Sequence, residues 1–185
     1  MHDEGFAFNV RPEVETDRPH IRDVHSAAFG DDQVPNLVDA LRSASAPTAP
    51  MSYVAVRDNR IIGHIMMSAG RLDAPRQIVN VLVLSPLGVL PEFQKRGIGT
   101  ALVKNAIEAA EQRGEPLVFL EGSPRFYGLR GFERASETGF RTPSLRIPDQ
   151  AFQVARLSSY ELWMTGTLVY SDPFWALDCV GLRDV

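Results

Sequence analysis

The segment from Gln77 to Thr100 constrains the fold more than any other part of the chain. It begins with a long apolar run, VNVLVLSPLGV, which predicts a buried strand, but Pro86 and Gly88 lie inside that run. Proline lacks the N–H that a strand ladder uses, and glycine weakens a strand. We therefore expect irregular pairing near the end of this strand, as a bulge or a splayed edge.

A turn containing two glycines follows the strand and opens a helix that should end at Gly114. The turn consists of Gln94, Lys95, Arg96, Gly97, Ile98, Gly99 and Thr100. The first turn of a helix has unpaired N–H groups and a partial positive charge, and glycines let an anion approach the backbone. With the two cations beside it, the pattern favours a diphosphate ligand, although a plain glycine turn with solvated cations would have the same spacing.

Two other phosphate-binding motifs can be compared with this turn. The P-loop string GxxxxGK[ST] does not occur in the sequence. A dinucleotide fingerprint GxGxxG fits at Gly97 and Gly99 but meets Leu102 at its third glycine, and a charged loop separates it from the strand. Glu121 does follow about 20 residues later, as that fingerprint requires, so a nicotinamide-binding protein stays a minor alternative.

Hydrophobic periodicity predicts a mixed α/β sheet that is partly antiparallel. Asp58 and Asn59 tolerate the left-handed backbone of a tight hairpin turn. The expected strands are one around Phe6, Phe8 and Val10, then 51–57, 60–68, 77–89, 116–120, 151–157 and 162–170, with a bend at Gly166. The expected helices are 17–30, 34–41 and the one after the glycine turn, with a short helix or turn at 124–127.

Composition limits the class of protein. The 185 residues include 19 basic and 23 acidic side chains, a net charge of −4, which argues against a general nucleic-acid binder. A single cysteine, Cys179, excludes an intramolecular disulfide or a cysteine metal cluster, and the histidines lack metal-ligand spacing. We see neither a signal peptide nor an apolar run long enough to span a membrane, so we expect a cytoplasmic protein with no membrane partner.

Two stretches, VLVLSPLGVLPEFQKRGIGTALVKNAIEAA and EGSPRFYGLRGF, together resemble the GCN5-related N-acetyltransferase (GNAT) superfamily, and its bacterial branch most. The first is similar to the acetyl-CoA motif Q/R-x-x-G-x-G/A, and the second to the element FY-x-x-x-GF. The resemblance implies a single-domain α/β acyl-CoA N-acyltransferase fold whose mixed sheet is splayed at the cofactor site. Residues 1–135 would form the core, and residues 136–185 a C-terminal extension that completes the sheet or pocket of the same domain.

The resemblance also implies how acetyl-CoA binds. Leu87, Gly88 and Val89 would pair through their backbone with the pantetheine arm. Gln94, Lys95, Arg96, Gly97, Ile98, Gly99 and Thr100 would hold the pyrophosphate, and Ser123 and Phe126 would lie along the pantetheine end. Arg125 and Arg130 could reach the 3′-phosphate or could be solvated.

The implied reaction is direct attack of a primary amine, from a small molecule or a peptide, on acetyl-CoA without a metal ion. Tyr127 matches the tyrosine that protonates the departing thiolate, and its phenol, with a pKa near 10, suits that role. The base stays open between Glu121 and His64. Cys179 stands alone near the C-terminus, which disfavours a covalent route.

One departure from the family pattern leaves a second function open. Leu120 occupies the position where many members have an asparagine, six residues before the FY phenylalanine. A non-catalytic acyl-CoA-binding regulatory module on the same fold is therefore the alternative. The aromatic tail with Trp163, Tyr170, Phe174 and Trp175 closes the core, contacts a second copy or lines the acceptor pocket. A homodimer is the family-level expectation.

Overall fold

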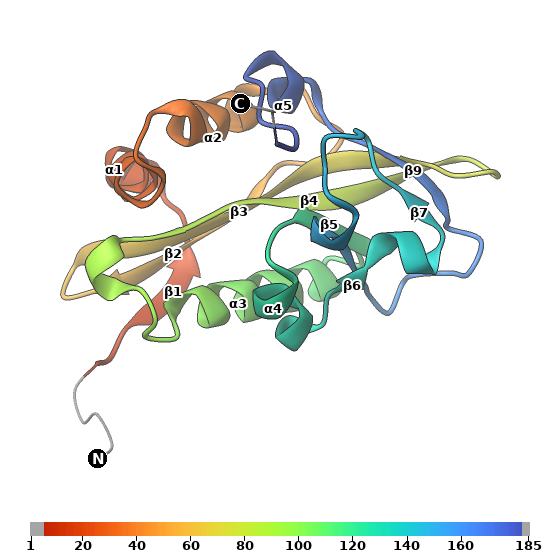
Figure 1. Ribbon diagram of the computed structural model, residues 1–185. Helices are drawn as coiled ribbons and strands as arrows, with labels where there is room; N and C mark the ends of the chain where they lie inside the picture. Colours follow the sequence, from red (N-terminus) through yellow and green to blue (C-terminus); the bar gives the residue numbers. More distant parts are fainter. Residues whose placement is uncertain (1–5, 183–185) are drawn as a thin grey trace.

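The computed structural model describes residues 6–182, which form a mixed sheet covered by helices on both faces (Figure 1). The sheet has the order β1-β2-β3-β4-β5-β8-β6, with β9 paired to β3 and β7 to β9. The strands are β1 (Asn9–Pro12), β2 (Met51–Arg57), β3 (Arg60–Asp73), β4 (Ile78–Val89), β5 (Leu117–Glu121), β6 (Glu133–Arg134), β7 (Phe140–Arg141), β8 (Phe152–Arg156) and β9 (Gly166–Val169). Within the described residues, no helix has both the length and the apolarity needed to cross a membrane.

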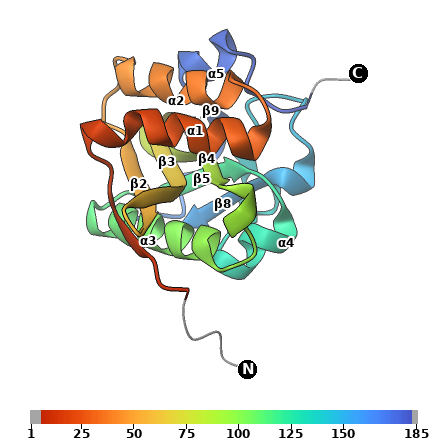
Figure 2. The same ribbon diagram turned by 90° about the vertical axis from the view of Figure 1, so that its left-hand side faces the viewer.

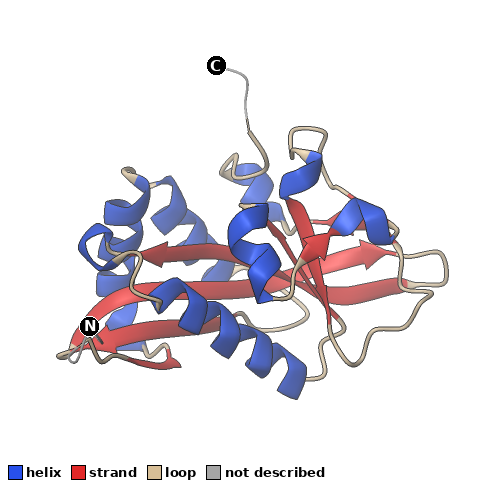
Figure 3. Cartoon of the chain, turned by 60° about the horizontal axis from the view of Figure 1, so that its bottom comes forward, coloured by secondary structure: helices blue, strands red, loops and turns tan. Residues whose placement is uncertain are grey.

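The helices divide between the two faces of the sheet. Figures 1 and 2 show α1, α2 and α5 on one face and α3 and α4 on the other, and Figure 3 shows the same layering from a third side. The α-helices are α1 (Arg18–Phe29), α2 (Gln33–Ser43), α3 (Ile98–Gln112), α4 (Pro124–Tyr127) and α5 (Asp172–Ala176). Short 3-10 helices are η1 (Glu15–Asp17), η2 (Pro91–Phe93), η3 (Gly128–Arg130), η4 (Ala135–Thr138) and η5 (Asp149–Ala151).

Strands β2 and β3 form an antiparallel hairpin next to β4, the middle strand of the sheet order. The turn residues Asp58 and Asn59 have φ values of 48° and 60°, as the sequence predicted. Strand β3 is longer than expected and continues past Ser68 to Asp73. Its far half is held between β4 on one edge and β9 on the other, which extends the ladder beyond the end of β2.

The sheet opens between β4 and β5. These parallel strands pair only at Leu82↔Val118 and Val83↔Phe119. Beyond that point β4 stays on β3, with Leu87 opposite Ile65 and Gly88 opposite His64. The register shifts there, because both Ser85 and Pro86 lie opposite the single residue Met66. The irregularity that Pro86 and Gly88 predicted is therefore present, and it directs the end of β4 away from β5.

Helix α3 packs its N-terminal half against the opened end of the sheet. Its buried side chains recur every three or four residues: Ile98, Leu102, Val103, Ala106 and Ala110. The helix lies close to β3 at Gly63, where an added Cβ would be 3.0 Å from Ile98 Cγ2 and 3.1 Å from Leu102 Cδ1. Gly97 precedes the helix with a φ of 85°, which a residue with a side chain rarely adopts.

Both ends of the chain differ from their expected elements. Strand β1 starts at Asn9 rather than near Phe6, since pairing with β2 begins there. Phe6 instead lies beside Phe8 and Phe93, with ring centroids 6.0 and 5.9 Å apart. The last strand covers only Gly166–Val169, because a turn joins Glu161 O to the N–H of Met164 before it. Helix α5 was not predicted, and β8 pairs antiparallel with β5.

Truncating the helix that carries the glycine turn should destabilise the fold. Leu102 is a fully buried residue of α3, so we expect Leu102→Ala to lower the free energy of unfolding by about 2–5 kcal/mol. Urea denaturation measures the change. Lys104→Ala on the solvent side of the same helix is the control and should change stability by less than about 0.5 kcal/mol. Equal effects of the two substitutions would contradict the packing described for α3.

Candidate active site

A pocket of about 580 Å³ lies between the open end of β4, the N-terminus of α3 and helix α4. Every residue predicted to contact the cofactor lines it except Gly88 and Arg96, and Tyr127 lines it as well. The lining consists of Leu87, Val89, Phe93, Gln94, Lys95, Gly97, Ile98, Gly99, Thr100, Ser123, Phe126, Tyr127 and Arg130. The structure thus brings together side chains and backbone from segments more than thirty positions apart in the sequence.

The α3 end of this pocket offers backbone donors to an anion. Helix α3 begins after Gly97 with no hydrogen bond from a side chain to its cap. The first N–H groups of a helix have no partner inside the helix, and the helix dipole makes this end electropositive. Gly99 keeps the approach open, since a Cβ there would project to 3.3 Å from Phe126 Cζ. A phosphate group suits such a site.

The side chains of Gln94 and Arg96 make different contacts. The Gln94 amide donates a hydrogen bond of 3.1 Å to the carbonyl oxygen of Val89, a backbone group at the open strand end. The exposed Arg96 places its guanidinium 4.9 Å from the ring centroid of Phe6, and its side chain does not line the pocket. Gln94 therefore stabilises the open end of β4 itself.

Arg130 fixes the wall of the pocket formed by α4. Its guanidinium donates to Thr100 Oγ1 at 3.2 and 2.5 Å and to the carbonyl oxygen of Phe126. It also stacks 3.7 Å from the centroid of the Phe126 ring. Arg130 thus joins α4 to the first turn of α3, while Arg125 stays exposed.

Tyr127 places a phenol in the pocket wall. Its ring contacts Phe126 and Phe132 edge-on, with centroids 4.8 and 5.7 Å away. Burial raises the pKa of Tyr127 to about 12, and the nearby charge of Arg130 only partly offsets this. The phenol is therefore protonated at neutral pH, which is the form that can donate a proton or a hydrogen bond.

Glu121 lies at the end of β5 but does not line this pocket. Its carboxylate accepts hydrogen bonds from the hydroxyl of Tyr170 at 3.2 Å and from the N–H of Gly181 at 3.0 Å. Burial raises the pKa of Glu121 despite these two donors. Tyr170 also lines a second pocket of about 210 Å³, together with the loop after α2 and the start of α5.

Comparison with known proteins identifies the family. Residues 9–135 match the family model described as an acetyltransferase (GNAT) domain. The chain belongs to the GNAT acetyltransferase family. It is 28% identical over 176 residues to the uncharacterized N-acetyltransferase YjhQ of Escherichia coli strain K12. The matched region covers 91% of this chain and 93% of the relative. The resemblance predicted from the sequence is thereby confirmed.

Two solved structures resemble this GNAT chain over most of its length. The GNAT family N-acetyltransferase YhbS from Escherichia coli, solved in complex with CoA, is 27% identical with a TM-score of 0.83 and covers 94% of this chain and 95% of its own. A GNAT family acetyltransferase from Brucella melitensis, solved in complex with acetyl-CoA, is 26% identical with a TM-score of 0.73. The match covers 91% of this chain and 98% of the Brucella chain. The predicted GNAT fold, with its mixed sheet and flanking helices, is confirmed.

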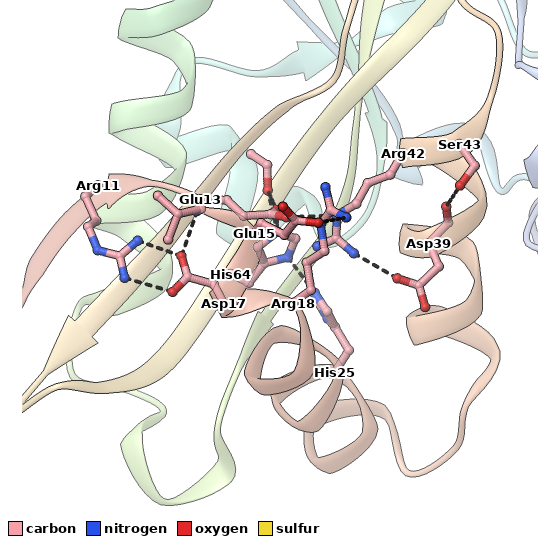
Figure 4. Close-up of polar contacts among 12 residues, drawn as sticks. Arg11, Glu13, Glu15, Asp17, Arg18, His25, Asp39, Arg42, Ser43 and His64 are labelled. Atoms are coloured by element: carbon pink, nitrogen blue, oxygen red, sulfur yellow. Dashed lines mark hydrogen bonds and ion pairs between the residues drawn. The ribbon is translucent and has the colours of Figure 1, made fainter.

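The other candidate base of this GNAT chain, His64, is buried in a polar cluster behind the open strand (Figure 4). Its Nδ1 lies 2.7 Å from Nε2 of His25 on α1, and its Nε2 lies 2.7 Å from Oγ of Ser52 on β2. The Ser52 hydroxyl donates to Glu13 Oε2, and Arg42 forms an ion pair with Glu13 at 2.9 Å. Among residues 6–182, no three His, Cys, Asp or Glu side chains are arranged to hold a metal ion.

Sequence reasoning missed His25, Ser52 and Glu13 as parts of one cluster. His25 did carry a signal, because it follows Ile21 by one helical turn and therefore lies on the apolar face of α1. A polar side chain on a buried face needs a hydrogen-bonding partner. That requirement could have suggested a buried partner, although it does not say which one.

The Glu13 cluster should make stability depend on pH. Burial alone would raise the pKa of Glu13, but hydrogen bonds from His64, Arg42 and Ser52 lower it from 4.5 to about 2. A depressed pKa in the folded state stabilises the protein above pH 4.5, and this contribution is lost as the pH falls through 2. We expect Glu13→Gln to have a lower free energy of unfolding than wild type at pH 7. The difference between the two proteins should narrow as the pH falls from 4.5 to about 2.

Urea unfolding at several pH values measures that gap. Glu15→Gln is the matched control, because the Glu15 side chain is 85% exposed and should show no comparable gap. A stability difference between Glu13→Gln and wild type that stays constant from pH 7 to pH 2 would contradict the assignment.

Proposed function

We propose that this chain is an acetyl-CoA-dependent N-acetyltransferase that transfers the acetyl group to a primary amine by direct attack in a ternary complex. The observation that carries this proposal is the opening between β4 and β5 beside the uncapped N-terminus of α3. An opened sheet leaves backbone groups for a peptide-like arm, and the helix end suits a diphosphate. The binding of CoA and of acetyl-CoA by the two relatives solved with these ligands supports it.

The polar and apolar groups of the pocket match the parts of a CoA thioester. We assign the backbone N–H groups at Ile98, Gly99 and Thr100 to the diphosphate, with Lys95 adding positive charge at the rim. The backbone of residues 87–89 would pair with the pantetheine amides, and the Phe126 ring would cover that arm. When bound, acetyl-CoA supplies an acetyl group activated by a thiol leaving group.

Two groups of this chain would act on the charges that develop during transfer. A backbone N–H near Val89 would hydrogen-bond the thioester carbonyl as its oxygen becomes negative. Tyr127 would protonate the departing sulfur, since it lines the same pocket and its raised pKa keeps its proton in place at neutral pH. Glu121 would contribute negative charge on the side of the sheet where Tyr170 and the second pocket lie.

The second pocket is our candidate for the acceptor site. Its lining comes from the loop at Ser45 to Pro47, the β3 residues Gly70 and Arg71, and the C-terminal residues Tyr170 and Asp172. Tyr170 is one of the four tail aromatics for which the sequence left open a place in the acceptor pocket. Arg71 and Asp172 place one charge of each sign on its wall, so the acceptor class we propose, a primary amine from a small molecule or a peptide, rests on the N-acetyl transfer and not on the charge of this pocket.

A non-catalytic acyl-CoA-binding module is the second candidate. Leu120 favours it, because this side chain is buried in the core and provides no polar group where many family members have an asparagine. Both candidates predict binding of CoA, and only the enzyme predicts release of free thiol. NADH serves as the ligand control, because a nicotinamide-binding protein would be stabilised against heat by NADH and not by CoA.

The deciding experiment measures free thiol released from acetyl-CoA with a panel of primary amines, for wild type and Tyr127→Phe. We expect wild type to turn over at least one amine and Tyr127→Phe to lower kcat by about 100-fold, because the phenolic proton donor is lost. The thermal stabilisation by CoA should be equal in both. Stabilisation of wild type by CoA without thiol release from any amine would overturn the enzyme in favour of the binding module.

A charge placed at the glycine turn should abolish binding. We expect Gly99→Glu to lose the thermal stabilisation by CoA, because its carboxylate would enter the pocket where the diphosphate binds. Gln112→Glu adds the same charge at the exposed far end of α3 and should leave the stabilisation unchanged. Equal stabilisation of both variants by CoA would refute the assignment of the turn to the diphosphate.

A further inference from the structure

The second pocket lies at a break in the edge of the sheet. Strand β2 pairs with β3 only as far as Met67, and β9 pairs with the same edge only from Arg71 onward. Residues 68–70 therefore have no strand partner on this edge, and Ala69 and Gly70 line the pocket there. Backbone groups on an unpaired edge are available to a ligand. The pocket volume of about 210 Å³ suits a small molecule, because drug-sized ligands occupy roughly 300–1,000 Å³.

Two side chains of opposite charge line this pocket without pairing with each other. Arg71 belongs to β3 and Asp172 to the start of α5, and both residues are exposed. Neither side chain has an ion pair or a hydrogen bond within residues 6–182. Opposite charges closer than about 4 Å would form an ion pair, so these two lie farther apart. Both charges are thus left for a ligand that fits between them.

A buried hydroxyl at the same place also lacks a partner. Ser171 lines the pocket, and its Oγ is buried without a hydrogen-bond partner in the described part of the chain. A buried polar atom is costly to leave unpaired, and a ligand can supply the missing partner. A hydroxyl can donate to a carboxylate or accept from an ammonium group. The pocket therefore suits a ligand that carries both charges.

Tyr170 connects this pocket with the opening between β4 and β5. It lines the pocket, and its hydroxyl donates a hydrogen bond of 3.2 Å to Glu121. Glu121 lies two residues beyond Phe119, the last residue of β5 that pairs with β4, so it belongs to the strand end that diverges. Its carboxylate forms no ion pair with any of the residues described, although the charge of Arg146 acts on it from a distance. A second negative group thus lies one tyrosine side chain away from the pocket.

We propose that the acceptor is a free amino acid that carries a second amine at the end of its side chain. This inference rests on the proposed function. The α-carboxylate binds Arg71 and the hydroxyl of Ser171, and the α-ammonium binds Asp172. The side chain extends along Tyr170 and brings its terminal amine to Glu121. Such a molecule has one negative and two positive groups, which match the one positive and two negative side chains of the site.

Transfer takes place at the side-chain amine, because Asp172 lines the second pocket and not the one assigned to acetyl-CoA. The nitrogen forms a bond to the acetyl carbon, and the bond from that carbon to the CoA sulfur breaks. The side-chain ammonium loses two protons in all. One replaces, through water, the proton that Tyr127 gives to the departing sulfur, and the other is released to solvent. Ammonium and thioester thus become amide, thiol and one free proton.

The test compares lysine with two analogues that each lack one group of its head. The compound 1,5-diaminopentane has no carboxylate, and 6-aminohexanoate has no α-ammonium. We expect wild type to release thiol with lysine, or with its shorter homologue ornithine, at a kcat/KM about 10-fold or more above that of either analogue. Fragmentation of the product in a mass spectrometer should locate the acetyl group on the side-chain nitrogen. An acetyl group on the α-nitrogen overturns the inference.

Each variant should lose only the contact that it removes. Arg71→Gln should lower kcat/KM for lysine by about 10-fold and leave that for 1,5-diaminopentane unchanged. Asp172→Asn should have the same effect on lysine and leave 6-aminohexanoate unchanged. Arg76→Gln and Asp73→Asn are the matched controls, because they remove the same charges at exposed positions outside this pocket, and they should change none of these rates. Equal losses on lysine and on the analogue overturn the inference.

A measurement without turnover separates this inference from the proposed function. In protein labelled with nitrogen-15, lysine alone should shift the amide signals of Arg71, Ser171 and Asp172, and Arg71→Gln should weaken its binding. These shifts without thiol release from any amine would support the amino-acid site and overturn the proposed function. Thiol release with other amines, while lysine shifts none of these signals, would overturn the inference and leave the proposed function standing.

Discussion

The short pairing between β4 and β5 is the constraint on which the rest of the site depends. Parallel hydrogen bonding ends at Val83, and the extra residue at Ser85-Pro86 keeps the following strand on β3. Meanwhile β5 is held on its other edge by the antiparallel strand β8. The opening is therefore built into the ladder on both sides. Buried backbone groups need partners, so the gap favours a ligand with amides of its own.

One strand end organises both faces of the sheet. On one face, the side chains of Leu87 and Val89 meet the first turn of α3, which supplies backbone donors and the dipole. On the other face, Gly88 lets the imidazole of His25 approach the backbone itself. The pocket and the buried histidine cluster therefore lie on opposite faces of the same strand end, because alternate residues of a strand point to opposite sides.

Sequence alone predicted the features that depend on local stereochemistry. Pro86 and Gly88 predicted the irregular strand, Asp58 and Asn59 the hairpin, and the turn at Gly97 the start of α3, because each of these residue types has backbone preferences of its own: proline restricts φ, and glycine, asparagine and aspartate tolerate a positive φ. The cluster at His64 joins residues 39 positions apart in sequence, so only the packed fold shows that His25 is its partner. The predicted strand bounds in the C-terminal tail were also wrong. Short strands such as β9 are defined by the strands they pair with and not by their own hydrophobic pattern.

Amide hydrogen exchange with and without CoA tests the central claim most directly. The account holds that the backbone at the opened strand end and the first turn of α3 together bind the cofactor. It predicts that CoA slows exchange at Ile98, Gly99 and Thr100 and at residues 87–89, with little change at the far end of α3. Exchange that slows elsewhere, or that does not change at these amides while CoA is bound, would contradict it.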